Sequence, residues 1–123
     1  QSTVVGIGGG PSFGFTQRDA IELYQQDQET KVIVLLGEIG GSLEEDAAAY
    51  IKEHVTKPVV ALIVGRNAPK GKSVGQAGAI ISGNVGTAAT KINALRDAGV
   101  TVVSTPVELS EAVKAAYENL KEA

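Results

Sequence analysis

Glu38 is the residue whose type and setting most favour chemistry in this chain. It directly follows a largely apolar segment, residues 31–36, and three glycines surround it, Gly37, Gly40 and Gly41. Small neighbours allow a partner group to approach the backbone and the carboxylate closely. A solvated loop acid would have the same local sequence, so these residues alone leave a functional and a structural role equally open.

Two glycine-containing segments match phosphate-binding motifs only in part. In residues 6–11, the position at which a dinucleotide fingerprint has a helix-opening glycine is Pro11. In residues 66–73 (RNAPKGKS), Arg66 takes the place of the first glycine of a P-loop, and a poor helix start follows. The lysines there could still attract a phosphate by charge. We therefore expect neither a dinucleotide site nor a true P-loop.

His54 is the one histidine of the chain, and there are no cysteines. The lack of cysteine excludes disulfides, thiolate catalysis and thiolate-bound metal. His54 lies near the end of an expected helix, where a partly cationic imidazole suits the helix dipole. No acid or nucleophile is placed to make it catalytic, so we expect a structural role for His54 and no metal site.

Charge and hydropathy exclude two further classes of function. The 123 residues have a net charge of −3, and the lysines and arginines are scattered. Nucleic-acid binding needs a concentrated basic face, which this pattern does not give. The apolar runs are far too short to span a bilayer. We therefore expect no nucleic-acid partner and no membrane segment.

The elements that must position Glu38 follow an alternating pattern. Short runs rich in β-branched residues predict strands at residues 3–7, 31–36, 58–64 and 100–103. Between and after them, amphipathic segments predict four helices. Their expected N-terminal caps are Thr16, Thr87 and two capping boxes, Ser42 with Glu45 and Thr105 with Glu108; Gly99 is expected to end the third helix.

Strands that are apolar throughout and separated by helices predict an α/β fold, a flavodoxin-like open parallel sheet with helices on both faces. Residues 1–123 are expected to form one domain. Ligands of such sheets gather at the carboxyl ends of the strands. Three glycine-rich loops, at residues 8–14, 37–41 and 65–78, are expected there. The sequence thus indicates a glycine-lined crevice without naming a reaction.

Five segments, in this order, resemble the C-terminal ligase domain of the succinyl-CoA synthetase α subunit. They are GIGG at 6–9, GEIGG at 37–41, YIKEHVTKPVV at 50–60, APKGK at 68–72 and AGAII at 77–81. The resemblance covers nearly the whole chain. ATP-citrate lyase has a similar GEIGG-type loop, but the APKGK segment fits the synthetase better.

The resemblance implies an acid–thiol ligase that makes acyl-CoA from a small carboxylic acid, CoA and ATP or GTP with Mg²⁺. In that family a histidine in a GHAGAI motif carries a phosphoryl group. The matching residues here are Gly75, Gln76, Ala77 and Gly78, so glutamine stands at the carrier position. The resemblance also implies that Glu38, after Gly37, hydrogen-bonds the carrier.

Gln76 places catalysis in question. Its amide nitrogen lone pair is delocalised, so it cannot accept a phosphoryl group, although the amide can imitate the hydrogen bonds of an imidazole. The alternative interpretation is therefore a catalytically inactive ligase-like domain with a role in structure, assembly or regulation. An engineered variant, a natural paralogue and a sequence discrepancy remain open as origins of Gln76.

The resemblance also implies partners. The family domain begins with a further strand and helix, preceded by a CoA-binding Rossmann domain, and neither precedes Gln1 in this sequence. A sheet without that strand would expose backbone and apolar surface. We therefore expect a β subunit, a complementary α-subunit segment, or both. Most of the CoA and nucleotide contacts would come from them. The implied compartment is the cytoplasm of a bacterium or archaeon, or the mitochondrial matrix.

Overall fold

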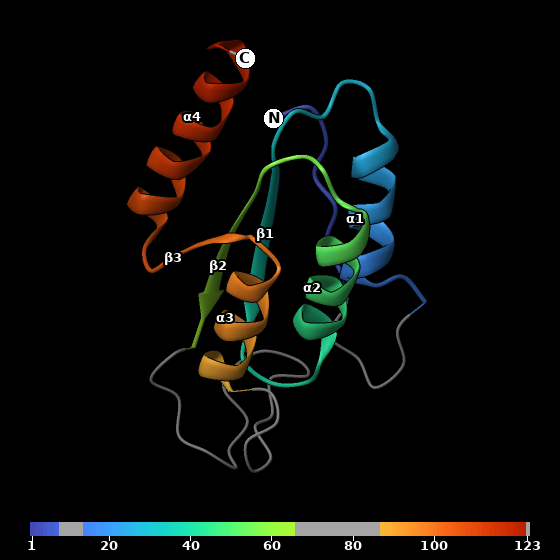
Figure 1. Ribbon diagram of the computed structural model, residues 1–123. Helices are drawn as coiled ribbons and strands as arrows, with labels where there is room; N and C mark the ends of the chain where they lie inside the picture. Colours follow the sequence, from blue (N-terminus) through green and yellow to red (C-terminus); the bar gives the residue numbers. More distant parts are fainter. Residues whose placement is uncertain (8–13, 66–86, 123) are drawn as a thin grey trace.

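The computed structural model describes residues 1–7, 14–65 and 87–122, and within them it is an α/β layer (Figure 1). The elements follow one another along the chain in this order: α1 (Gln17–Gln26), β1 (Ile33–Glu38), α2 (Leu43–His54), β2 (Val59–Val64), α3 (Ala88–Asp97), β3 (Thr101–Val103) and α4 (Pro106–Glu122). The predicted α/β class and the parallel sheet are confirmed.

The described sheet has three strands in the order β1-β2-β3, and both pairs are parallel. Ile33 lies opposite Val59 and Glu38 opposite Val64, so β1 and β2 end together. The predicted strand at 31–36 is displaced by two residues, because pairing with β2 continues through Glu38. Glu38 is therefore the last strand residue instead of a loop residue.

The predicted strand at residues 3–7 is wrong. These residues form no strand, and the Thr3 carbonyl accepts a hydrogen bond from the Tyr24 hydroxyl at 3.1 Å. That contact holds the segment beside α1 instead of beside β1 (Figure 1). β-Branched composition favours a strand only where a neighbouring strand can bond its backbone. Residues 3–7 have no such neighbour in the described sheet.

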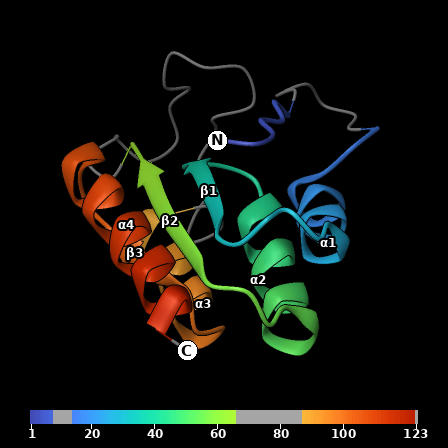
Figure 2. The ribbon, with the colours of Figure 1, turned by 90° about the horizontal axis from the view of Figure 1, so that it is seen from above.

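Helices cover both faces of the sheet, as predicted, but unequally. The helices α1, α2 and α3 pack side by side over one face, and α4 lies alone on the other (Figures 1 and 2). The core lies under the three-helix layer, where Ile51, Ala61 and Leu95 are among the buried residues. No residue of α4 is buried.

The unequal cover leaves part of β1 exposed. Along β1, buried and exposed residues alternate, with Ile33 and Leu35 in the core and Val34 and Leu36 on the opposite face. The exposed fractions of Val34 and Leu36 are 42% and 63%. In β2, by contrast, the first five residues are all buried. The α4 face of β1 is therefore an uncovered apolar surface within the described structure.

Most of the predicted helix ends are confirmed. Thr16 accepts a hydrogen bond from the Asp19 amide and forms a capping box with it, and Thr87 accepts one from the Thr90 amide. Gly99 ends α3 with φ of +86°, a conformation that favours glycine. None of the described helices is both long and apolar enough to cross a membrane.

The two predicted capping boxes fare differently. At α4, Thr105 Oγ1 accepts a hydrogen bond from the Glu108 amide at 3.1 Å, and Pro106 opens the helix as predicted. The Glu108 carboxylate accepts from the Ser104 amide instead of the cap amide, so only half of that box forms. At α2, Ser42 makes no side-chain cap bond, and the predicted box there is wrong.

Candidate functional site

The turn after β1 lies at the carboxyl ends of β1 and β2, where a parallel sheet places its ligands. The Ile39 amide donates to the Val64 carbonyl at 3.2 Å and so continues the sheet pairing past Glu38. Gly40 and Gly41 then turn the chain with φ of +95° and +62°. These angles strain residues with a Cβ, which explains the glycine pair. The turn predicted at 37–41 begins only after Glu38, and of the loop predicted at 65–78 only Gly65, directly after β2, is among the described residues.

Glu38 lies at this turn with one carboxylate oxygen buried and unsatisfied. Its Oε2 is inaccessible to solvent and has no hydrogen-bond partner in the described structure. Burial raises the pKa of the Glu38 carboxyl above its ordinary value, and the Glu44 carboxylate raises it further, while Lys91 opposes both. Buried polar atoms in proteins are nearly always hydrogen-bonded. An unpaired buried oxygen therefore indicates a position where another group can donate a hydrogen bond.

Glu44, in the first turn of α2, is the residue that contacts Glu38. Its Oε2 accepts a hydrogen bond from the Glu38 backbone amide at 3.2 Å and another from Gln17 Nε2 at 3.1 Å. Its exposed fraction is 3%. Glu44 therefore fixes the backbone of Glu38 and ties the start of α1 to the same turn.

Lys91, from α3, neutralises Glu44. Its Nζ lies 2.6 Å from Glu44 Oε1, 2.8 Å from Glu45 Oε1 and 3.0 Å from the Gly41 carbonyl oxygen. These three acceptors use all three N–H donors of the ammonium group. Its exposed fraction is 0%. The buried cation accounts for one half of the absent capping box, because the Glu45 carboxylate binds Lys91 instead of the Ser42 amide.

Gly37 makes the close approach of Glu44 possible. A Cβ at this position would lie 2.7 Å from Glu44 Oε2 and 2.8 Å from Ile63 Cδ1. Both distances are well below van der Waals contact. Gly37, one of the predicted site residues, is thus needed for packing beside Glu38.

Gln17 adds a second unsatisfied acceptor to the site. Its Nε2 donates to Glu44, while its Oε1 is buried and has no partner in the described structure. The two unsatisfied atoms, Gln17 Oε1 and Glu38 Oε2, are both hydrogen-bond acceptors. Chemically, oxygen acceptors suit an N–H or O–H donor or a cation, and they do not suit an anion.

The structure brings together only part of the predicted site. Glu38 and Gly37 lie together at the turn, whereas Gly75, Gln76, Ala77 and Gly78 lie outside the described residues. So do the P-loop-like segment 66–73 and most of the glycine loop at 8–14. His54 ends α2, away from Glu38, with its imidazole 3.7 Å from the Glu53 carboxylate. That placement agrees with the predicted structural role.

Sequence reasoning missed Gln17, Glu44 and Lys91. Lys91 carried a signal that could have found it, because it lies three residues after Ala88 and four before Leu95, on the apolar stripe of α3. A charge on such a stripe is rarely buried without a partner. Glu44 was hidden among the acids of the first turn of α2, each of which suits a helix start.

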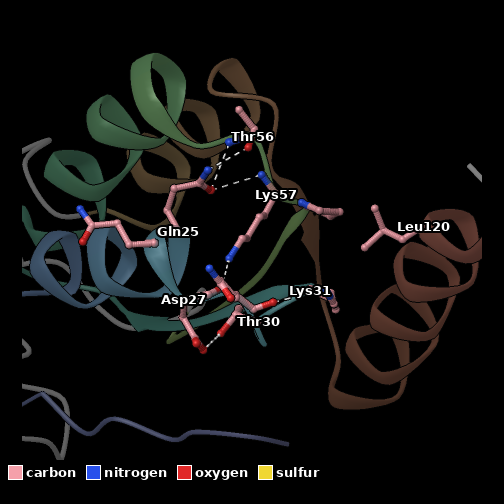
Figure 3. Close-up of a pocket in the computed structure, with 10 residues that line it drawn as sticks. Gln25, Asp27, Thr30, Lys31, Thr56, Lys57 and Leu120 are labelled. Atoms are coloured by element: carbon pink, nitrogen blue, oxygen red, sulfur yellow. Dashed lines mark hydrogen bonds between the residues drawn. The ribbon is translucent and has the colours of Figure 1, made fainter.

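A hollow of about 390 Å³ lies at the other end of the sheet from Glu38, beside the residues that precede β1 and β2 (Figure 3). There Lys57 Nζ donates to the carbonyl oxygens of Tyr24 and Asp27, at the end of α1. Gln25 accepts from the Thr56 and Lys57 amides and donates to the Thr56 hydroxyl. Figure 3 shows that the bonds of Lys57 with Asp27 and of Gln25 with Thr56 and Lys57 run between residues that line the hollow. The hollow is thus held by polar groups that already satisfy one another.

Among residues 1–7, 14–65 and 87–122, no group of three or more histidine and acidic side chains is arranged to hold a metal ion. Within the described residues, the carboxylates nearest the site, Glu44 and Glu45, are already engaged in ion pairs with the Lys91 ammonium.

The comparison with known proteins agrees with this arrangement. Residues 1–101 match the family model described as CoA-ligase. Succinate–CoA ligase [ADP-forming] subunit alpha 1 of Archaeoglobus fulgidus is 52% identical over 118 residues, which are 96% of this chain and 40% of that protein. The corresponding α subunit of Aquifex aeolicus is 53% identical over 113 residues, which are 92% of this chain and 37% of that protein. The chain thus spans about two-fifths of these relatives.

Solved structures give the same assignment. An ATP citrate lyase from Methanosaeta concilii, in complex with (3S)-citryl-CoA, superposes with a TM-score of 0.84 at 33% identity over 92% of this chain. One from Methanothrix soehngenii, in complex with citrate and coenzyme A, gives a TM-score of 0.85 over 94%. This chain covers 19% of each. From the match over residues 1–101, the α/β fold and the identity with succinate–CoA ligase α subunits, the chain belongs to the CoA-ligase family.

Proposed function

We propose that this chain is the α-subunit portion of an acid–thiol ligase that joins a small carboxylic acid to CoA through a phosphoryl relay. The observation that carries the proposal is the buried, unsatisfied Glu38 Oε2 at the carboxyl end of β1. A carboxylate oxygen in this position suits the N–H of a carrier imidazole. It would fix the imidazole tautomer and stabilise the cation that forms on phosphorylation.

In the proposed relay, a nucleoside triphosphate transfers its terminal phosphoryl group to the carrier and leaves as the diphosphate. The acid carboxylate then attacks that phosphorus, releasing the carrier and forming an acyl phosphate. The CoA thiolate attacks the acyl carbon and expels inorganic phosphate. The unsatisfied atoms of the described site are acceptors, so they fit the carrier instead of the phosphates of CoA or a nucleotide. We assign the CoA and nucleotide–Mg²⁺ contacts mainly to regions beyond this chain.

Gln76 supports a second candidate function, a ligase-like domain without phosphoryl transfer that serves structure, assembly or regulation. Glutamine cannot carry the phosphoryl group, yet its amide N–H can donate to Glu38 Oε2 as an imidazole would. The site would then keep its hydrogen bonds and lose its chemistry. The two functions differ only in what happens at residue 76.

The deciding experiment compares the unchanged chain with Gln76→His. Each is combined with a β subunit of the succinate–CoA ligase type and incubated with nucleotide labelled in its terminal phosphate. Acid-labile label on the unchanged chain supports the ligase and contradicts the inactive domain. Label only on Gln76→His supports the inactive domain and assigns residue 76 as the carrier position. Absence of label from both chains contradicts the relay.

Within the described residues, the strand β1 has an unpaired edge and an exposed apolar face that a partner could cover. In the described sheet β1 pairs only with β2, which leaves its other edge unpaired, and Val34 and Leu36 are exposed on its α4 face. We propose that a complementary α-subunit segment adds a strand there, and that the β subunit packs nearby. A single monomeric species that fails to bind a hydrophobic dye would contradict this. Loss of dye binding when the complementary segment is added would support it.

A further inference from the structure

We propose that Lys91 and Glu44 are positioning residues for Glu38, and that their buried ion pair presents Glu38 Oε2 as the acceptor of the site. The inference rests on the proposed function only for the identity of the group that Glu38 would orient. The positioning itself concerns residues that the structure describes.

Glu44 and Lys91 hold the backbone of the turn that contains Glu38. The Glu38 amide donates to Glu44 Oε2, and Lys91 holds the other oxygen of the same carboxylate. Lys91 also binds the Gly41 carbonyl, on the other side of the turn. The two residues therefore clamp the turn at both ends, at Glu38 and at Gly41.

Lys91 also balances the negative charges of the side chains that surround Glu38. Around Glu38, α2 contributes Glu44 and Glu45, α3 contributes Lys91, and α1 contributes the neutral Gln17. Because Lys91 binds both acids, Glu44 and Glu45 are already paired and do not compete with Glu38 for an incoming donor. Without the ammonium, the negative charge of Glu44 would act on Glu38 with no opposing cation, which would disfavour the ionised form of Glu38.

The Lys91–Glu44 pair does more than link α2 to α3. Lys52 of α2 and Asp97 of α3 already join the same two helices, 2.8 Å apart at the surface. A buried ion pair is often no more stabilising than apolar side chains of similar size. Helix packing alone therefore does not account for a cation at residue 91, whereas its contact with the turn does.

The test is a carboxyl titration of Glu38 by carbon-detected NMR on the 123-residue chain. Glu44→Gln keeps an acceptor for the Glu38 amide but removes a negative charge, so the pKa of Glu38 should fall. Lys91→Met removes the cation that lowers the pKa of Glu38, so that pKa should rise. Each change should be about threefold or more in the acid dissociation constant. Lys52→Met, the matched control, should leave Glu38 unchanged.

Opposite shifts in the two variants support positioning. Shifts in the same direction, or no shift relative to Lys52→Met, overturn it. If Lys91→Met does not fold, the paired variant Lys91→Met with Glu44→Leu replaces it, read by hydrogen exchange. The Glu38 amide should then exchange about tenfold faster or more, while the interior amides of α2 and α3 stay protected. Unchanged exchange at Glu38 overturns the proposal.

A final measurement separates this inference from the proposed function. In the Gln76→His background, with the β subunit, the pH profile of carrier phosphorylation should move with the Glu38 pKa in each variant. A profile that stays fixed while that pKa moves overturns positioning of the carrier. Absence of phosphorylation even in Gln76→His overturns the proposed function instead, and the Glu38 titration still decides the role of Lys91 and Glu44.

Discussion

Lys91 Nζ lies 2.6 Å from Glu44 Oε1, and both side chains are almost completely buried. The pair joins α3 to α2 beneath the turn that carries Glu38. Removing one partner of a buried ion pair strongly lowers the stability, because the remaining charge stays in a low-dielectric environment.

Lys91→Met should therefore lower the free energy of unfolding by about 3–5 kcal/mol. Urea unfolding followed by circular dichroism measures this. Lys52→Met, which breaks the exposed ion pair between the same helices, should change stability little. Adding Glu44→Leu to Lys91→Met should recover a large part of the loss, and equal losses for the Lys91 and Lys52 variants would contradict the prediction.

Gly37→Ala should displace the Glu44 carboxylate, because the new Cβ would lie 2.7 Å from Glu44 Oε2. We expect a loss of about 1–3 kcal/mol in unfolding free energy, the usual cost of overpacking. The Glu38 amide resonance should also shift as its acceptor moves. Gly14→Ala is the control, since a Cβ there meets nothing within 4 Å. A Gly37→Ala chain as stable as the control would show that the site has room for the methyl group.

Glu38→Gln should make the protein more stable at neutral pH than the unchanged chain. The pKa of Glu38 is raised above its ordinary value of 4.5, so the folded state holds this proton more tightly than the unfolded state. Stability from this group is present below pH 4.5 and is lost as pH rises from there through the folded pKa. The advantage of Glu38→Gln should therefore grow over that window and then level off.

Urea unfolding of both chains from pH 3 to pH 8 measures this difference. The variant also lacks the carboxylate proposed to orient the carrier, so greater stability should accompany loss of carrier phosphorylation in the Gln76→His background. A stability difference that does not change with pH would show that Glu38 ionises equally in both states.

Lys57→Met should loosen the end of α1. The ammonium group donates to the carbonyl of the C-cap residue Asp27 and to that of Tyr24, which also accepts a longer bond of 3.3 Å from the Asp27 amide. We expect a loss of about 1–2 kcal/mol. Lys31→Met is the control, because exposed Lys31 makes a single bond of 3.3 Å to the Gln28 carbonyl. Faster amide exchange in the last turn of α1, in the Lys57 variant only, would identify the mechanism.

Much of the fold followed from local sequence pattern. The apolar runs before Glu38 and at Val59–Val64 predicted parallel strands without polar alternation. The first five residues of β2 are all buried, whereas Val34 and Leu36 of β1 are exposed in the described structure. Caps at Thr16, Thr87 and Thr105 were readable, because each bond closes within three residues. The strand predicted at 3–7 failed for the opposite reason, since a strand depends on a neighbour that composition does not reveal.

By itself, the sequence determined the family, the turn and its carboxylate. Five ordered segments indicated the family, and among them GEIGG placed a carboxylate beside a glycine turn in which Gly40 and Gly41 have positive φ. Only the tertiary structure decided how Glu38 is held. Lys91 is 47 residues from Glu44 and 50 from Gly41, and their contact exists because α2 and α3 pack together over the sheet. Hydrogen bonds of that range come from packing, and no local pattern encodes them.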